Sequence, residues 1–217
     1  MMRLVFTIFT ILLISNKFFG QSSFGPPSNP TYGNVQSDIP QEYYIEANGK
    51  SGEDLKETIH QIIANHIAFP YTSSSTDTWD ILQQSDQDPD NNDNILLVYT
   101  DRSQDKGYRD GCNCYSNYEN GTHANSWNRE HVWPKSHGFP DEDDVAYTDV
   151  HNLKPCDRSV NSSRGTRDYD YGGNQHSEAT ECLYDSDSWE PSDSVKGDIA
   201  RIIFYMVVRY DPGYDHD

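Results

Sequence analysis

The sequence is poor in basic residues and in long apolar segments. It contains 16 Lys and Arg residues against 35 Asp and Glu residues, which gives a formal net charge of −19 at pH 7. Such a chain lacks the net basic surface on which nonspecific nucleic-acid binding usually depends. Its longest apolar run, residues 4–14, is too short to span a bilayer. Composition taken alone therefore argues against a nucleic-acid-binding protein and against an integral membrane protein.

Several widespread catalytic signatures are also missing. The sequence contains no HExxH, no GxSxG and no P-loop pattern. Zincin-type peptidases, α/β-hydrolases and P-loop NTPases use these patterns to supply metal ligands, a nucleophile and a phosphate cradle, respectively. No motif supports any of these three classes of enzyme.

The N-terminus has the features of a secretory signal. Arg3 precedes the apolar run, and a polar stretch begins at Gln21. Residues 1–20 are therefore predicted to be a signal peptide, with a retained membrane anchor as the alternative. Because they hold Arg3 and Lys17 but no acid, their removal changes the net charge from −19 to −21. We expect a secreted or periplasmic protein that has no membrane attachment after cleavage.

The four cysteines suggest disulfide bonds, because an even number of cysteines in an exported chain usually pairs. Cys112 and Cys114 lie too close together to pair comfortably with each other. Each is therefore expected to bond to one of Cys156 and Cys182, in an order that the sequence leaves open. A zinc site is the alternative, although the spacing C-x-C differs from the usual C-x₂₋₄-C.

The pattern after the signal predicts one domain that mixes helices and strands. Residues 21–50 are rich in Ser, Pro, Gly, Asn and Tyr and predict a flexible N-terminal arm, and residues 51–217 are long enough for a single domain. Apolar residues at helical spacing predict a helix from Ser51 whose core-facing stripe reaches Ile67, and another over 194–210. Residues 95–100 predict a buried strand. Loops are expected at 76–93, 101–126 and 170–193.

The loop at 76–93 carries alternating aspartates at positions 86, 88 and 90. Such a pattern can bind calcium, but the turn glycine and the closing glutamate of an EF-hand loop are missing. A solvated acidic loop is the favoured interpretation.

Residues 128–134, with the sequence NREHVWP, form the first of two clusters of chemically versatile residues. The apolar and aromatic residues before Pro134 fit the end of a strand. In a strand, the neighbours Glu130 and His131 point to opposite sides and cannot easily bind one ion together. They can instead divide the work of phosphodiester hydrolysis, with the carboxylate on a metal and the imidazole as a base for water.

Residues 149–165 form the second cluster. Asn161 lies in a segment that can become helical from about Asp157, and a carboxamide oxygen together with the Glu130 carboxylate suits Mg²⁺. Arg164 falls on the same helical face at i+3 and is a candidate phosphate contact. The alternatives are that Asn161 caps a helix and that Arg164 pairs with a nearby aspartate such as Asp168.

The charge is uneven, which weakens the objection from acidic composition. Residues 151–167 hold four basic residues against Asp157 alone, whereas the acidic residues are concentrated elsewhere. Local charge matters more than the total for steering a charged ligand.

Three of these segments together resemble a known family. They are REHVWP at 129–134, DVHNLKP at 149–155 and VNSSRG at 160–165. They are similar to the bacterial endonuclease I family of secreted or periplasmic nucleases, in the ββα-metal (His-Me finger) superfamily. The resemblance covers roughly residues 52–210 and implies an α+β fold with a ββα-metal finger core.

The resemblance also implies roles for single residues. His131 would be the general base that activates water. Glu130 and Asn161 would bind Mg²⁺, with Mn²⁺ or Ca²⁺ as possible substitutes, and Arg164 would contact a phosphate. The other residues of these segments would frame the site, namely Arg129, His151 and Asn152, although His151-Asn152 can equally be an ordinary hydrogen-bonded turn.

The implied substrate is DNA, and also RNA, cut without sequence preference by a monomer to leave 5′-phosphates. Family members usually continue into further helices after the segment that matches 209–210, so the chain is expected to be a fragment or a trimmed variant. Two other classes of protein are alternatives. One is a catalytically inactive, acidic extracellular binding module with the same fold, and the other is a calcium-binding surface protein that uses residues 86–93.

Overall fold

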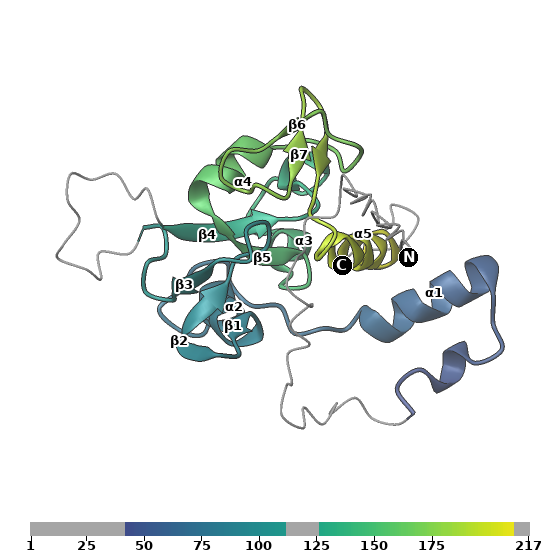
Figure 1. The fold of residues 1–217 in the computed structure, drawn as a ribbon. Coiled ribbons are helices and arrows are strands. Elements are labelled where there is room, and N and C mark those ends of the chain that lie inside the picture. Colours follow the sequence, from purple (N-terminus) through teal and green to yellow (C-terminus); the bar gives the residue numbers. More distant parts are fainter. Residues whose placement is uncertain (1–41, 112–125, 211–217) are drawn as a thin grey trace, which may run out of the picture. The chain divides into compact units, whose positions relative to one another are not determined.

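The computed structural model describes residues 42–111 and 126–210, all within the second of two units, residues 31–217 (Figure 1). Helices and short strands are mixed along the chain, which confirms the predicted α+β class. The elements are η1 (Ile45–Ala47), α1 (Gly52–Ile63), α2 (Thr78–Ser85), β1 (Gln87–Asp88), β2 (Asn91–Leu96), β3 (Ser103–Asp105), β4 (Trp127–His131), η3 (Lys135–His137), α3 (Val145–Thr148), β5 (Leu153–Asp157), α4 (Arg158–Arg164), β6 (Asn174–Gln175), β7 (Leu183–Tyr184), β8 (Trp189–Glu190) and α5 (Lys196–Arg209).

The strands form three antiparallel sheets, in the orders β1-β2-β3, β4-β5 and β6-β7-β8. The second sheet and α4 make a ββα unit, since α4 follows β5 without a loop and the strands pair along their whole length. Pro155 is tolerated within β5 because it lies opposite Arg129 at a non-hydrogen-bonded pair, where its missing N–H would point away from β4. Helix formation from about Asp157 is confirmed by α4.

Apolar clusters hold the ββα unit to the elements around it. The largest joins it to β8 and α5 through buried residues that include Val160, Trp189 and Ile199. A second joins it to α2, where the rings of Trp79 and Trp127 meet edge to face with centroids 4.9 Å apart. The ββα unit is therefore packed on both sides, which fixes the side chains that it carries.

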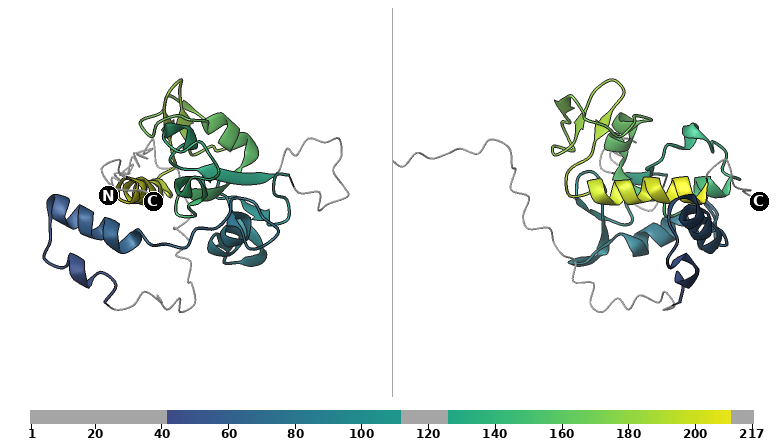
Figure 2. Two further views of the ribbon diagram at one scale, coloured as in Figure 1. Left: turned by 180° about the vertical axis from the view of Figure 1, so that it is seen from behind. Right: turned by 90° about the vertical axis from the view of Figure 1, so that its right-hand side faces the viewer.

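Helix α5 is tied to the segment that precedes β5 and to α1 (Figure 2). The hydroxyls of Tyr205 and Tyr210 donate to the buried carboxylate of Asp149 at 2.6 and 2.8 Å. Burial alone would raise the pKa of Asp149, but these bonds and those from His151 outweigh it and lower the pKa to about 2. On the other side, His60 Nδ1 lies 2.9 Å from the carbonyl oxygen of Val208.

Some element boundaries differ from the predictions. The last helix is confirmed over Lys196–Arg209, but α1 ends at Ile63, and Ile67 is 79 % exposed, so its assignment to a core-facing stripe is wrong. The predicted strand at 95–100 begins earlier, as β2. It ends at Leu96 because the chain then turns, and Val98 N donates to the carbonyl of Pro155 at 2.9 Å instead.

The predicted loops contain short regular elements. At 76–93, Asp77 and Asp80 form a capping box that starts α2, and Trp79 and Leu82 bury the inner face of that helix. The prediction of a solvated acidic loop over 76–93 is wrong for residues 78–85, because the capping box is a local signal that starts a helix. The other two loops contain β3 and the strands β6, β7 and β8.

The disulfide prediction is wrong for two cysteines. Cys156 and Cys182 are free thiols with no exposed surface, and they pack in the largest apolar cluster. Burial raises the pKa of the Cys182 thiol to about 11, so it remains protonated at neutral pH. Both residues behave as small apolar core residues, a common role for free cysteine. Cys112 and Cys114 lie outside the described residues.

The predicted signal peptide at 1–20 also lies outside the described residues. The described end of the predicted arm, residues 42–50, forms η1 and contacts α1, because the Tyr43 hydroxyl donates to the carbonyl of Ile62 at 3.4 Å. No helix within 42–111 or 126–210 is long and apolar enough to cross a membrane.

Candidate active site

The β4 strand directs the side chains of the two main candidate catalytic residues, Glu130 and His131, to opposite sides, as predicted from strand geometry. Glu130 contacts Tyr99 and Arg164, whereas the ring of His131 packs against the aromatic residues Tyr71 and Tyr147. Both candidates are almost fully buried, with exposed fractions of 2 % and 7 %. Their protonation therefore depends on their neighbours in the protein more than on bulk solvent.

His131 has one ring nitrogen anchored and one free. Its Nε2 lies 2.9 Å from the carbonyl oxygen of Tyr147, an atom that can only accept, so the ring proton is on Nε2. The lone pair is then on Nδ1, which makes no hydrogen bond to the described residues. Burial is the main reason that the pKa of His131 is lowered to about 4. The imidazole is neutral at physiological pH, as a general base must be.

Glu130 also has one polar atom held by the protein and one that is not. Its Oε1 accepts a hydrogen bond from the Tyr99 hydroxyl at 2.8 Å and lies 3.0 Å from Arg164 Nη1, while Oε2 has no partner among the described residues. Burial raises the pKa of Glu130 to about 7, although Arg164 and Tyr99 act in the opposite direction. A second cation, in addition to Arg164, would be needed to keep this carboxylate fully ionised at neutral pH.

Asn161 reaches from α4 to the backbone and side chains of β4. Its Nδ2 donates to the carbonyl of Arg129 at 3.2 Å and to Asn128 Oδ1 at 2.8 Å. Because the Arg129 carbonyl can only accept, this contact fixes which end of the carboxamide faces the strand. Asn161 Oδ1 is left as an acceptor that is unused within the described part of the chain.

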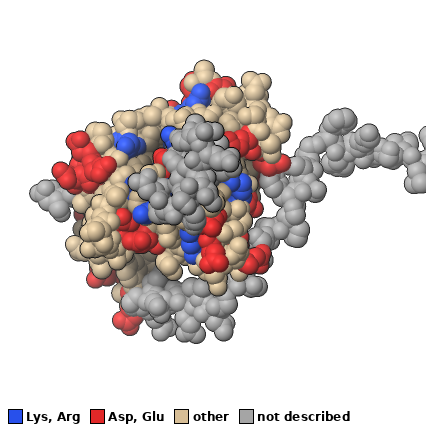
Figure 3. Space-filling view, turned by 90° about the vertical axis from the view of Figure 1, so that its left-hand side faces the viewer, with Lys and Arg blue, Asp and Glu red and all other residues tan. Residues whose placement is uncertain are grey.

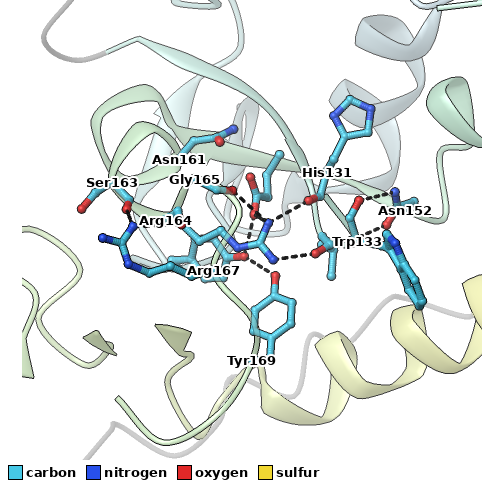
Figure 4. Close-up of polar contacts among 12 residues, drawn as sticks. His131, Trp133, Asn152, Asn161, Ser163, Arg164, Gly165, Arg167 and Tyr169 are labelled. Atoms are coloured by element: carbon cyan, nitrogen blue, oxygen red, sulfur yellow. Dashed lines mark hydrogen bonds and ion pairs between the residues drawn. The ribbon is translucent and has the colours of Figure 1, made fainter. Parts of the chain in front are cut away.

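Arg164 does not face solvent. It is 1 % exposed, and it donates from Nη1 to the carbonyl of His131 at 3.0 Å and from Nη2 to that of Val132 at 2.8 Å. In Figure 4 the side chains of His131 and Asn161 lie on one side of this guanidinium, and Tyr169 lies on the other. The expected phosphate contact is not supported by this placement, because the guanidinium is enclosed by Glu130 and backbone carbonyls.

The three residues expected to frame the site differ in their contacts. Asn152 is fully buried, and its carboxamide bonds both backbone groups of Trp133, just after β4. His151 is exposed and stacks on Tyr205 with ring centroids 4.7 Å apart. Arg129 is 9 % exposed and points away from the Glu130 side of the strand.

Some residues that position the site were not predicted. Asn128 could have been found, since a strand places it on the same side as Glu130 two residues later. Tyr99 and Tyr147 carry no local signal. Their contacts to Glu130 and His131 join residues 31 and 16 positions apart in the sequence, so they exist only in the folded chain.

The available donors fit a hard divalent cation. In the described residues no group of three or more His, Cys, Asp and Glu side chains could hold a metal ion. Glu130 Oε2 and Asn161 Oδ1 are nevertheless two oxygen atoms without a partner among the described residues, and they belong to side chains of β4 and α4. One carboxylate and one carboxamide, completed by water, form an oxygen set of the kind that Mg²⁺ accepts.

A ββα unit with an imidazole at the end of its first strand and with side-chain oxygen atoms on the strand and the helix has the arrangement of a ββα-metal finger. The chain belongs to the endonuclease I family, since the family model described as Endonuclease I matches residues 51–215. It is 45 % identical over 174 residues to a protein named extracellular ribonuclease from Bacillus subtilis (strain 168), covering 79 % of this chain and 55 % of that protein. It is also 45 % identical over 171 residues to a protein of the same name from Bacillus amyloliquefaciens, covering 79 % and 54 %. The chain thus spans about half the length of these relatives.

Proposed function

We propose that the protein is a secreted, Mg²⁺-dependent endonuclease that hydrolyses phosphodiester bonds without sequence preference and acts as a monomer. One observation carries this proposal. His131, Glu130 and Asn161 each have one polar atom anchored to the protein and one acceptor atom that no described residue uses. All three come from one chain and one ββα unit. Secretion is supported by the relatives, which are named extracellular.

In the proposed reaction, His131 Nδ1 accepts a proton from the attacking water. The Tyr147 carbonyl holds the ring in the required tautomer and orientation throughout. Glu130 and Asn161 would hold the cation, which when bound stabilises negative charge on the phosphate and on the leaving oxygen. The products carry 5′-phosphates. Since the nucleophile is water and not a ribose hydroxyl, both DNA and RNA are expected substrates, which also agrees with the word ribonuclease in the relatives' names.

The nature of the product ends tests this function. We expect Mg²⁺ to support cleavage of an RNA oligonucleotide and of its all-deoxy equivalent, with 5′-phosphate and 3′-hydroxyl ends identified by mass spectrometry and no cleavage in EDTA. Cleavage confined to RNA with 2′,3′-cyclic phosphate ends would mean that the base acts on the 2′-hydroxyl. Absence of cleavage on either substrate would favour the inactive binding module.

The two proposed metal ligands predict a second result. Glu130→Gln and Asn161→Ala should each raise the Mg²⁺ concentration for half-maximal activity by about tenfold or more, since loss of even an indirect ligand contact commonly costs that much. The measurement is a Mg²⁺ titration of the initial rate. Glu53→Gln and Asn174→Ala change the same residue types at exposed positions and should leave the titration unchanged. Unchanged curves for Glu130→Gln or Asn161→Ala would remove that residue from the ligand set.

A further inference from the structure

A cavity of ≈ 410 Å³ opens next to the candidate active site, between α2, the segment before it and the start of β4. It touches residues that contact both halves of the site. Tyr71 stacks on the ring of His131 with centroids 5.8 Å apart, and Asn128 accepts a hydrogen bond from Asn161 at 2.8 Å. A ligand in the cavity would therefore lie beside a substrate at the site. The walls that matter here are Tyr71, Thr72, Trp79, Arg109, Asn128 and Arg129.

Arg129 is a buried cation in this cavity with unused donors. It is 9 % exposed, and its Nη atoms donate to the Tyr71 carbonyl, to Thr78 Oγ1 at 2.8 Å and to Thr72 Oγ1 at 3.1 Å. A guanidinium has five N–H groups, so these three bonds leave two unmatched. One of them is on Nε, which is buried and has no partner in the described part of the chain. Within that part, Arg129 also forms no ion pair with a carboxylate.

Arg109 adds a second cation without a counter-ion. Its guanidinium lies over the ring of Trp79 at 5.2 Å from the centroid and has no ion pair within the described residues. The carboxylate in the cavity wall belongs to Asp110, whose Oδ2 is already 3.5 Å from Arg158 Nε. The cavity is therefore positive, although the chain has a net charge of −19.

On the face drawn in Figure 3, Lys and Arg side chains are interspersed with Asp and Glu and form no broad basic patch. An isolated buried cation is unfavourable unless an anion or hydrogen-bond acceptors compensate it. Neither guanidinium group has a carboxylate partner within the described residues, so both are available to an anionic ligand. Guanidinium groups match phosphate oxygens in geometry as well as in charge.

We propose that this cavity is a subsite for the phosphate group of the substrate strand next to the scissile phosphodiester, with Arg109 and Arg129 as its ligands. The inference rests on the proposed nuclease function and deepens it. A base-stacking pocket fits less well, because the Trp79 ring is 7 % exposed and both guanidinium groups already lie over it. Contacts to phosphate also carry no sequence information, in agreement with cleavage that is independent of sequence.

The test compares substrates with and without a neighbouring phosphate. For wild-type protein, kcat/KM should be higher on a trinucleoside diphosphate than on a dinucleoside monophosphate. Arg109→Gln should lower kcat/KM on the longer substrate by about tenfold, the usual effect of losing a hydrogen bond to a charged group, and leave the shorter one unchanged. Arg109→Lys should keep part of the difference in kcat/KM between the longer and the shorter substrate. On longer single strands, Arg109→Gln should lower the slope of log KM against log salt concentration. The decrease should be about the amount that one phosphate contact contributes.

Arg201→Gln is the matched control, because Arg201 is exposed on α5 and pairs with Asp198. It should behave as wild type on both substrates. A trinucleotide whose second linkage is a neutral methylphosphonate should behave like the dinucleotide. If Arg109→Gln affects both substrates equally, or neither, the subsite is wrong while the nuclease function stands. If wild-type protein cleaves no substrate, the proposed function itself fails.

Discussion

His131→Ala should lower kcat for phosphodiester cleavage by about 10²–10⁴-fold, the usual contribution of a general base. The substitution removes the only imidazole of the ββα unit, together with the free Nδ1 that would accept the proton of water. Because the anchoring bond ends on a backbone carbonyl, its loss leaves no charged partner buried. The fold should therefore survive, with unchanged circular dichroism.

The control for this variant is His137→Ala. His137 is exposed in η3, and the contact it makes with Trp133 uses its backbone carbonyl, which the substitution keeps. Its kcat should equal that of wild type. Full activity in a folded His131→Ala protein would show that His131 is not the general base. The proposed reaction would then have no residue assigned to activate water.

The buried imidazole also predicts how stability changes with pH in metal-free buffer. Burial lowers the pKa of His131 from its ordinary value of 6.5 to about 4 in the folded protein. Between these two values the unfolded chain binds the proton and the folded chain does not, so the free energy of unfolding should fall as the pH falls from 6.5 to 4. Below pH 4 this effect should stop. Urea unfolding in EDTA should show a shallower decline over that window for His131→Ala than for wild type.

The sequence was most informative where the site is local. Strand alternation predicts that Glu130 and His131 diverge, and the helix after Asp157 brings Asn161 to the edge of β4. Both features depend on residues close together in the chain. The resemblance to the endonuclease I family is carried by the same local segments.

The contacts that give each residue its chemistry were not predictable from the sequence. The raised pKa of Glu130 depends on burial by elements that are distant in the sequence, and the Tyr99 hydroxyl that partly offsets this rise is 31 residues away. Likewise, the spacing of Arg164 from Asn161 places both residues on one helical face, but it does not predict that the Arg164 side chain is buried. A residue one turn from a ligand can face solvent or the core, and only the packing of α4 against β4 and α5 decides between them.

Arg164→Ala is expected to cost about 3–5 kcal/mol of unfolding free energy, the usual consequence of removing one partner from a buried ion pair. The variant would leave the Glu130 carboxylate with Tyr99 as its remaining anchor, and the carbonyls of His131 and Val132 without their donor. Arg164→Lys should rescue little, because a single ammonium cannot reach the carboxylate and both carbonyls at once. Thermal and urea unfolding measure the loss directly.

Arg158→Ala provides the comparison at the start of the same helix. Its 3.5 Å contact with Asp110 is between side chains that are 48 % and 36 % exposed, and such a pair contributes less than about 1 kcal/mol. The contrast separates two roles for Arg164. If Arg164→Ala unfolds at the same temperature as wild type and only raises KM, then Arg164 binds a substrate phosphate, as the family resemblance implied. If stability collapses, and pairing Arg164→Ala with Glu130→Gln recovers part of it, then the guanidinium acts as the internal counter-ion that holds the Glu130 carboxylate and the end of β4 in position.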